Sequence, residues 1–370
     1  MAEPLKNAFG SAVPTSMAAA IAAVHPTFPA KAFLADALAG HEPLALLERG
    51  RHFAAALARH LPADFEEAAD ILTASLGQKL TRTENNGMAP FFYLPHTIFV
   101  STHGLDHFEA SMSALYELTQ RFTAEFAIRP FIIRDAKRTL ARLRQWAGDE
   151  SVHVRRLVSE GTRPRLPWAM RLPDFQRDPA PVLALLELLK DDPELYVRRS
   201  VANNLNDIGK DHPDILTGVA AKWLVKASAE RTWIVRHALR SAIKRGEAKA
   251  LAVLDYAPAK QIRVDNAEIA PKHARIGSKL TLAFDVTNRA KSPSRLMVDF
   301  RIHYVKANGS TSPKTFKLTA LNLAAGETAR LSKSVSLKEM TTRKHYPGLH
   351  RIEALINGQA MPVGEFRLNK

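Results

Sequence analysis

The sequence predicts a mainly α-helical protein, with a HEAT-like helical-repeat solenoid followed by a small all-β immunoglobulin-like sandwich. A three-residue phrase recurs at spacings of 43 and 38 residues, as Val154-Arg155-Arg156, Val197-Arg198-Arg199 and Val235-Arg236-His237. Repeats of this length are typical of HEAT and armadillo arrays, in which helix pairs stack side by side. Helical spacing of apolar residues gives way to alternating runs near residue 257. We therefore expect a repeat domain over 1–256 and a sandwich over 257–370.

The helices are expected where apolar residues recur at i, i+3 or i+4, as Val154, Leu157 and Val158 do. They span 43–61, 64–76, 105–121, 132–146, 149–159, 180–190, 193–210, 214–226 and 230–246. Asp192 before Pro193 predicts a helix start, because a side-chain acceptor precedes a residue whose φ suits the first turn. The last four helices form two pairs, which is the expected two-helix repeat.

The sandwich is expected because Gly, Pro, Ser, Thr and Asn interrupt short alternating runs after residue 257. The clearest runs are 279–286, 296–305, 315–321, 329–335 and 350–356. About seven strands in this length are typical of an immunoglobulin-like sandwich. The sequence has no cysteine pair that would identify the topology further.

Composition and charge narrow the class of protein. The chain has 370 residues and a net charge of +15, of which residues 257–370 carry +12, from 20 Lys and Arg against 8 Asp and Glu. Such an excess suggests a polyanionic partner, although simple solubility would also account for it. The absence of cysteine excludes disulfides and thiol catalysis and fits the cytoplasm. We expect no membrane span, because the sequence has no run of about 18 apolar residues. We expect no signal peptide, because residues 11–24 lack a charged leader, an apolar core and a cleavage site in that order.

Motifs for common cofactors and metals are missing. The sequence contains no P-loop, no dinucleotide-binding glycine motif and no G-x-S-x-G elbow. His103 and His107 could share a helix face and bind a metal, but Gly104 between them favours a turn. We therefore expect neither a metal nor a cofactor.

Three acids and one tryptophan are the candidates for chemistry. Glu125 lies among aromatic residues just before Pro130. Glu160 follows Val154 by 6 residues and Asp207 follows Val197 by 10, so the two differ by about one helical turn and should point in similar directions. Each acid could alternatively be a solvated surface group. Trp168, on a loop rich in Pro and Arg, could stack on a base or fill the core beneath the loop.

The segments 122–131, 153–168 and 196–210, which contain these residues, resemble the AlkC family of bacterial alkylpurine DNA glycosylases. The resemblance covers roughly residues 40–250, and the C-terminal region is similar to the immunoglobulin-like domain that some members carry. It implies an enzyme that hydrolyses the N-glycosidic bond of N3-alkylated bases, chiefly 3-methyladenine and 3-methylcytosine, in double-stranded DNA. It also implies base excision repair in the bacterial cytoplasm, at the nucleoid when on DNA, without deep base flipping. We expect the protein to be a monomer.

The resemblance assigns catalysis to Glu125, Glu160 and Asp207 and contact with the lesion to Trp168. Clustered carboxylates can stabilise the positive charge of a sugar that is losing its base and can orient water. The sandwich is a candidate DNA-binding arm. Candidate phosphate contacts are Arg155, Arg156, Arg163, Arg165, Arg198, Arg199 and Lys210.

Two other classes of protein remain open. A non-catalytic repeat scaffold would bind DNA or protein, but three acids on an anion-binding surface would repel phosphate. An adhesion protein that uses the sandwich conflicts with the missing signal peptide.

Overall fold

The computed structural model describes residues 5–340 and 344–370. The chain divides into two compact units. The first comprises Met1–His212 and Ala227–Ala238, and the second comprises Pro213–Lys226 and Leu239–Lys370. The first unit is helical, and the second contains the β-sandwich together with helical segments. The mainly α fold with a C-terminal sandwich is therefore confirmed, whereas the boundary at residue 256 stays a prediction.

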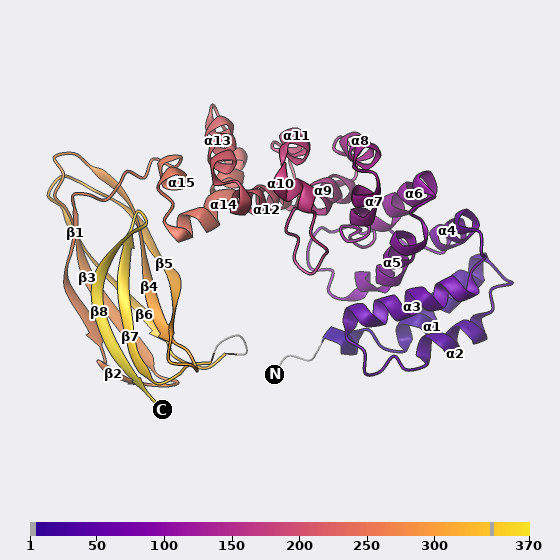
Figure 1. Ribbon diagram of the computed structural model, residues 1–370, viewed down its shortest axis with the longest axis horizontal. Helices are drawn as coiled ribbons and strands as arrows, with labels where there is room; N and C mark the ends of the chain where they lie inside the picture. The colour runs from indigo at the N-terminus through magenta and orange to yellow at the C-terminus, as the bar shows by residue number, and fades with distance from the viewer. Residues whose placement is uncertain (1–4, 341–343) are drawn as a thin grey trace. The chain divides into compact units, whose positions relative to one another are not determined.

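Consecutive helices build the first unit, as the indigo to magenta ribbon in Figure 1 shows. Its helices are η1 (Leu5–Ala8), α1 (Ala12–Val24), α2 (Ala30–Leu38), α3 (Leu46–His60), α4 (Phe65–Ala74), η2 (Ala89–Tyr93), α5 (Leu94–His103), α6 (Phe108–Thr119), α7 (Ile128–Arg134), α8 (Ala136–Trp146), α9 (Val152–Gly161), α10 (Pro173–Arg177), α11 (Ala180–Leu189) and α12 (Leu195–Asp211). The helices α13 (Pro213–Leu224) and α15 (Ala248–Ala252) belong to the second unit, and α14 (Ala229–Arg245) has residues in both.

The recurring phrase marks a structural repeat. Val154 and Val197 are fully buried. Arg155 donates from Nη1 to the carbonyls of Asp149 and Glu150, both at 2.9 Å. Arg198 repeats this pattern 43 residues later, donating to the carbonyls of Asp192 and Pro193. In these two copies the valine therefore packs in the core, and the first arginine fixes the turn that precedes its helix.

The predicted helix bounds need correction. The helices expected from 43, 105 and 149 begin at Leu46, Phe108 and Val152, and two further corrections have a clear physical reason. The helix expected over 132–146 is two helices, because the Asp135 carboxylate accepts a hydrogen bond from the backbone N–H of Arg138 (3.0 Å) and starts α8. The helix expected from residue 193 begins at Leu195. The Asp192 carboxylate accepts from the backbone N–H of Glu194 (2.9 Å), which forms a turn before the helix instead of capping it.

The segment Lys6–Val24 bears on the expectation that no part of the chain spans a membrane. By length and composition alone it is apolar enough to do so, a test that buried core helices and signal sequences also pass. Within α1, Met17 and Ile21 are fully buried. The helix packs against α2 and α4, so these two side chains belong to the core of the first unit.

The sandwich has eight strands within the described residues, shown in orange to yellow in Figure 1. They are β1 (Ile262–Ala270), β2 (His273–Arg275), β3 (Lys279–Asn288), β4 (Ser294–Val305), β5 (Thr311–Leu323), β6 (Thr328–Ser336), β7 (Gly348–Ile356) and β8 (Gln359–Asn369). One sheet has the order β1-β3-β6 and the other β2-β8-β7-β4-β5. Fully buried Phe284, Phe300 and Phe366 fill the core between them.

All five predicted strands are confirmed, and β1, β2 and β8 were missed. In β1 the pairing with β3 shifts between Asp265 and Glu268, which interrupts the alternation of buried and exposed residues. In β8, Pro362 and Gly364 break the pattern that a strand is expected to show. The strand β2 has only 3 residues, too few for a period to be visible.

Candidate active site

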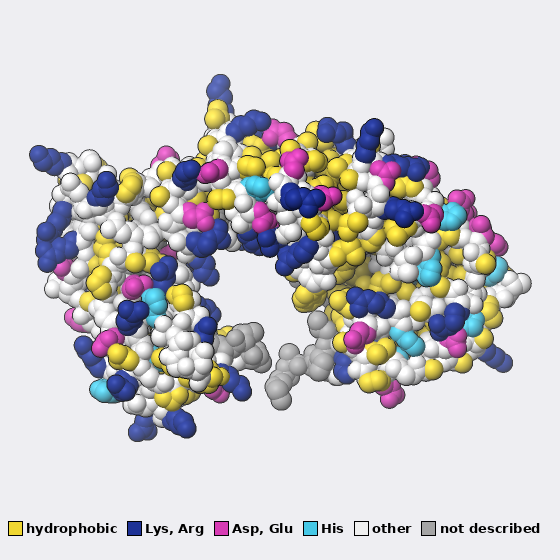
Figure 2. All heavy atoms as spheres, in the orientation of Figure 1, with side chains coloured by type: hydrophobic (Ala, Val, Ile, Leu, Met, Phe, Trp, Pro, Cys, Tyr) yellow, Lys and Arg dark blue, Asp and Glu magenta, His cyan; other side chains and the backbone are white. Residues whose placement is uncertain are grey.

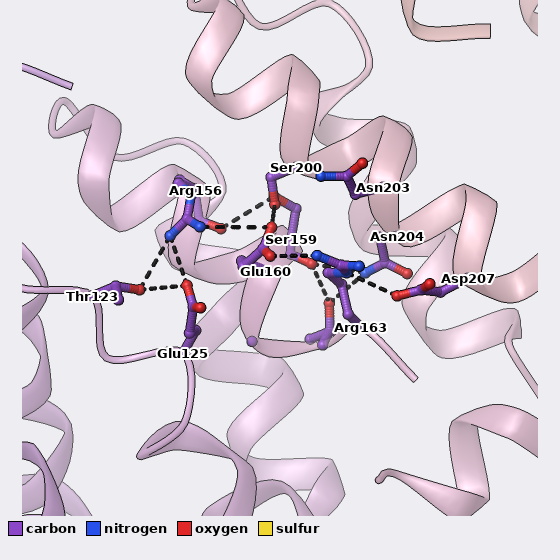
Figure 3. A network of polar contacts seen from close by, with 12 residues as sticks. Thr123, Glu125, Arg156, Ser159, Glu160, Arg163, Ser200, Asn203, Asn204 and Asp207 are labelled. Atoms are coloured by element: carbon purple, nitrogen blue, oxygen red, sulfur yellow. Dashed lines mark hydrogen bonds and ion pairs between the residues drawn. The ribbon is translucent and has the colours of Figure 1, made fainter. Parts of the chain in front are cut away.

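Glu160 and Asp207 lie on the neighbouring helices α9 and α12, and one arginine joins them (Figure 3). Arg163 donates from Nη1 to Glu160 Oε1 (2.6 Å) and from Nε to Asp207 Oδ2 (2.8 Å). Lys210 donates to the other oxygen of Asp207, at 2.6 Å. The structure therefore brings together the two acids that the repeat spacing predicted to point the same way.

Glu125 lies in the loop between α6 and α7 and joins the same network (Figure 3). Its Oε2 accepts from Thr123 Oγ1 (2.6 Å) and from Arg156 Nη1 (2.8 Å). Arg156 Nη2 also lies 3.8 Å from Glu160 Oε2. Two arginines thus connect three carboxylates in the order Glu125, Glu160 and Asp207.

Glu160 is ionised in this network. Burial would raise the pKa of its carboxyl, but the charges of Arg156 and Arg163 and the hydrogen bond from Ser200 outweigh burial and hold the pKa below its ordinary value. The Ser200 hydroxyl donates to Glu160 Oε2 at 2.6 Å, and Ser159 Oγ lies 2.7 Å from Ser200 Oγ. The carboxylate is therefore fixed in position by hydrogen bonds as well as by charge.

The arginines are charged as well. Burial would lower the pKa of Arg156 and of Arg163, but the adjacent carboxylates raise both above the ordinary value. With Lys210, three cations face the three acids. The cluster is thus a set of paired charges fixed before any ligand arrives, an arrangement that suits electrostatic stabilisation of a reacting group.

A cavity of about 810 Å³ opens beside the cluster. Glu125, Glu160, Arg163 and Trp168 line it, together with apolar side chains that include Phe91, Phe122 and Phe126. Asp207 is 1% exposed and does not line the cavity. Two of the three predicted acids therefore face the space that a substrate could enter, and the third lies behind Arg163.

Trp168 is not a core residue. Its side chain is 76% exposed, and its backbone has a φ of 65°, in the left-handed region that few residues other than glycine adopt. It lies on the irregular segment between α9 and α10, as the Pro-rich sequence predicted. The core-filling alternative is therefore wrong, and an exposed indole at the edge of the cavity is available for stacking.

The remaining basic residues predicted to contact DNA also have partners within the protein. Arg155 Nε binds Asp192 Oδ2 (2.7 Å), Arg165 Nε binds Asp211 Oδ2 (2.8 Å) and Arg199 Nη1 binds Glu84 Oε1 (2.6 Å). Arg198 donates to the backbone of the turn before α12. The role of these residues in DNA contact stays a prediction.

Sequence reasoning missed Thr123 and Ser200 as site residues, together with Arg129, which donates to the backbone carbonyls of Gly161 and Arg163. Ser200 follows Val197 by the same three residues that separate Leu157 from Val154, so a polar residue stands where the first copy has a buried leucine. That departure from the repeat is a signal that could have identified it. Thr123 and Arg129 lie near Glu125 in the sequence, but nothing in their spacing predicts their contacts.

A metal site has little support in the described part of the chain. Residues 5–340 and 344–370 contain no group of three or more His, Asp or Glu side chains that could hold a metal ion. His103 is the last residue of α5, and His107 precedes α6, so the two do not share a helix.

The fold and the site define a helical-repeat protein that carries a carboxylate–arginine cluster and a C-terminal immunoglobulin-like domain. Residues 263–370 match the family model described as the C-terminal Ig-like domain of the uncharacterised protein YhaZ. YhaZ of Bacillus subtilis, an uncharacterised protein, is 38% identical over 325 residues, 88% of each chain.

A solved structure resembles the whole chain. It is the alkylpurine DNA glycosylase AlkC of Pseudomonas fluorescens, bound to DNA containing an abasic site analog, with a TM-score of 0.91, 38% identity and 100% coverage of both chains. The chain belongs to the AlkC family.

Proposed function

We propose that this protein is a DNA glycosylase that removes alkylated bases from double-stranded DNA. The full-length likeness to AlkC supports the activity and the DNA partner. The observation that carries the proposal is a cavity lined by Glu125, Glu160 and the exposed Trp168. A protein that only bound DNA would gain nothing from carboxylates there, because each one pairs with an arginine that could otherwise contact phosphate.

The preferred substrates would be bases that are already cationic, such as 3-methyladenine and 3-methylcytosine. When the bond between C1′ and the base breaks, the base leaves with the bonding electrons as a neutral product, and positive charge develops on the sugar. Carboxylates at Glu125 and Glu160 would stabilise this oxocarbenium-like sugar. Water then adds to C1′ and transfers its proton to a carboxylate, which leaves an abasic site.

Asp207 would support this chemistry. Its carboxylate binds Arg163 and Lys210, so it holds Arg163 against Glu160. Trp168 would pack on the sugar or on the cationic base without drawing the base into a deep pocket. A cationic base is already a good leaving group, so this reaction would not need a metal ion to activate it.

The basic sandwich would add affinity for DNA. Residues 257–370 carry most of the net charge, and Figure 2 shows Lys and Arg side chains distributed over the domain. Contacts of this kind neutralise phosphates without reading sequence. A DNA-repair role of this kind would put the protein to work in the cytoplasm, on the nucleoid when it is bound to DNA.

The test is to incubate the protein with methylated duplex DNA and to identify the released bases by chromatography and mass spectrometry. The proposal predicts free 3-methyladenine and 3-methylcytosine and an equal number of abasic sites. DNA binding without release of any base would instead support the non-catalytic scaffold.

A further inference from the structure

Arg129 of α7 has no assigned part in the chemistry above, yet its side chain is fully buried. Within the described residues, its guanidinium makes four hydrogen bonds, all to backbone carbonyls. Nε and Nη2 donate to Met170 O at 2.9 and 2.6 Å. Nη1 donates to Gly161 O and Arg163 O, both at 2.8 Å.

A cation in this position is costly. Burial, together with the charge of Arg163, lowers the pKa of Arg129 to about 10. Its hydrogen bonds go to neutral carbonyls instead of a carboxylate, so within residues 5–340 and 344–370 no ion pair at hydrogen-bond distance offsets the loss of hydration. A buried guanidinium of this cost is expected only where the backbone carbonyls that it binds must be held in place.

The three carbonyls belong to the two ends of one loop. Gly161 and Arg163 lie where the chain leaves α9, and Met170 lies shortly before α10. Trp168 lies between these two ends, and its backbone is in the left-handed region. Its indole is exposed, so burial of this side chain does not hold the loop in place. Arg129 therefore ties together the two ends of the segment that carries Trp168.

The same guanidinium also binds the backbone of Arg163, a residue of the acid cluster. Arg163, whose carbonyl Arg129 binds, is the residue that joins Glu160 to Asp207. Arg129 thus connects the Trp168 loop to one wall of the cavity through a single side chain.

We propose that Arg129 is a positioning residue that clamps the loop 161–170 and so holds Trp168 at the cavity. The clamp itself follows from the contacts alone. Its consequence for base release rests on the proposed glycosylase function. A group held in place before the substrate arrives costs no ordering at the moment of reaction.

The chain offers a matched control in Arg49. This residue of α3 is also buried and also donates to backbone carbonyls, those of Lys6, Phe9, Glu42 and Leu44. Arg49→Lys therefore reports the general cost of shortening a buried arginine in the first unit, without touching the loop that carries Trp168.

The first experiment measures the loop without reference to activity. Trypsin can cut after Arg165 and Arg171, and the clamp predicts that Arg129→Lys speeds these cuts about tenfold or more, while Arg49→Lys does not. Equal cutting in the two variants would overturn the clamp. If Arg129→Lys does not fold, trypsin digestion of the wild-type protein still tests the clamp. Cleavage in this loop before cleavage elsewhere in the chain would show that the loop is not held.

The second experiment tests whether Arg129 acts through Trp168. In single-turnover base release, Arg129→Lys should slow the reaction about tenfold, the scale of a misplaced group. In a Trp168→Ala background the same change should cost less than about twofold. The same loss in both backgrounds would overturn the proposal. If the wild-type protein releases no base, the proposed function fails, while the trypsin result still tests the clamp.

Discussion

Replacing Ser200 by Ala removes one hydrogen bond from Glu160 and leaves its ion pairs in place. The Ser200 hydroxyl donates to Glu160 Oε2 at 2.6 Å, in surroundings where both side chains are buried. Hydrogen bonds to a charged group contribute about 1.5–3 kcal/mol to stability. We therefore expect Ser200→Ala to lower the free energy of unfolding by about 2 kcal/mol at pH 7, which is about 4–8 °C in Tm for a domain of this size.

The loss of unfolding free energy in Ser200→Ala depends on pH, and its direction follows from the pKa of Glu160. The pKa of Glu160 is lowered from its ordinary value of 4.5, because Arg156, Arg163 and Ser200 together outweigh the effect of burial. A depressed pKa stabilises the fold above the unfolded-state pKa, and that stability is lost as the pH falls through the folded-state pKa. Without Ser200 the folded-state pKa moves up toward 4.5, so the difference in stability between the two proteins is largest at neutral pH and narrows in acid.

Thermal unfolding of wild type and Ser200→Ala, measured from pH 7 downward through the folded-state pKa of Glu160 in both proteins, gives this difference. Ser159→Ala is the control, because Ser159 contacts Ser200 and not Glu160. It should cost about 1 kcal/mol or less, as a neutral hydrogen bond does, and with little dependence on pH. A Ser200→Ala cost that stays constant across this whole pH range would refute the conclusion that Ser200 stabilises an ionised Glu160.

The site and the charge of the sandwich support three further predictions. Trp168→Ala should slow base release about tenfold or more, while unfolding changes by less than about 0.5 kcal/mol because the indole is exposed, as denaturant titration would show. Replacing the exposed Lys314 and Lys317 of β5 by Ala should weaken DNA binding. The slope of log affinity against log salt concentration should fall by about one for each phosphate that is no longer neutralised. An unchanged slope would show that this strand does not touch DNA. Base release should persist in excess EDTA, and inhibition by the chelator would point to a metal.

Much of the fold could be predicted because its signals are local. The valines of the recurring phrase and the helical spacing around them report burial within one repeat, and β3 to β7 each contain an alternating run. One error came where a single residue decides the backbone. Asp135 separates α7 from α8 by capping, an interaction that the apolar period across 132–146 does not reveal.

The site was predictable only in part. Spacing from Val154 and Val197 predicted that Glu160 and Asp207 would point in similar directions, since the two helices are equivalent elements of the repeat. Their bridge, Arg163, lies in the loop after α9, and the partner of Glu125, Arg156, comes from a distant part of the sequence. These interactions depend on how the loops pack against the helices, and the repeat spacing does not predict the position of loop residues.

The most direct test of the central claim compares base release by wild type, Glu125→Gln and Asp207→Asn on methylated duplex DNA. Both substitutions keep size and shape but remove a negative charge, so the loss of electrostatic stabilisation should slow release by on the order of a hundredfold. Affinity for DNA with an abasic-site analogue, measured in parallel, should be unchanged or higher. Release by both variants at the wild-type rate would contradict the claim that this carboxylate cluster carries out the reaction.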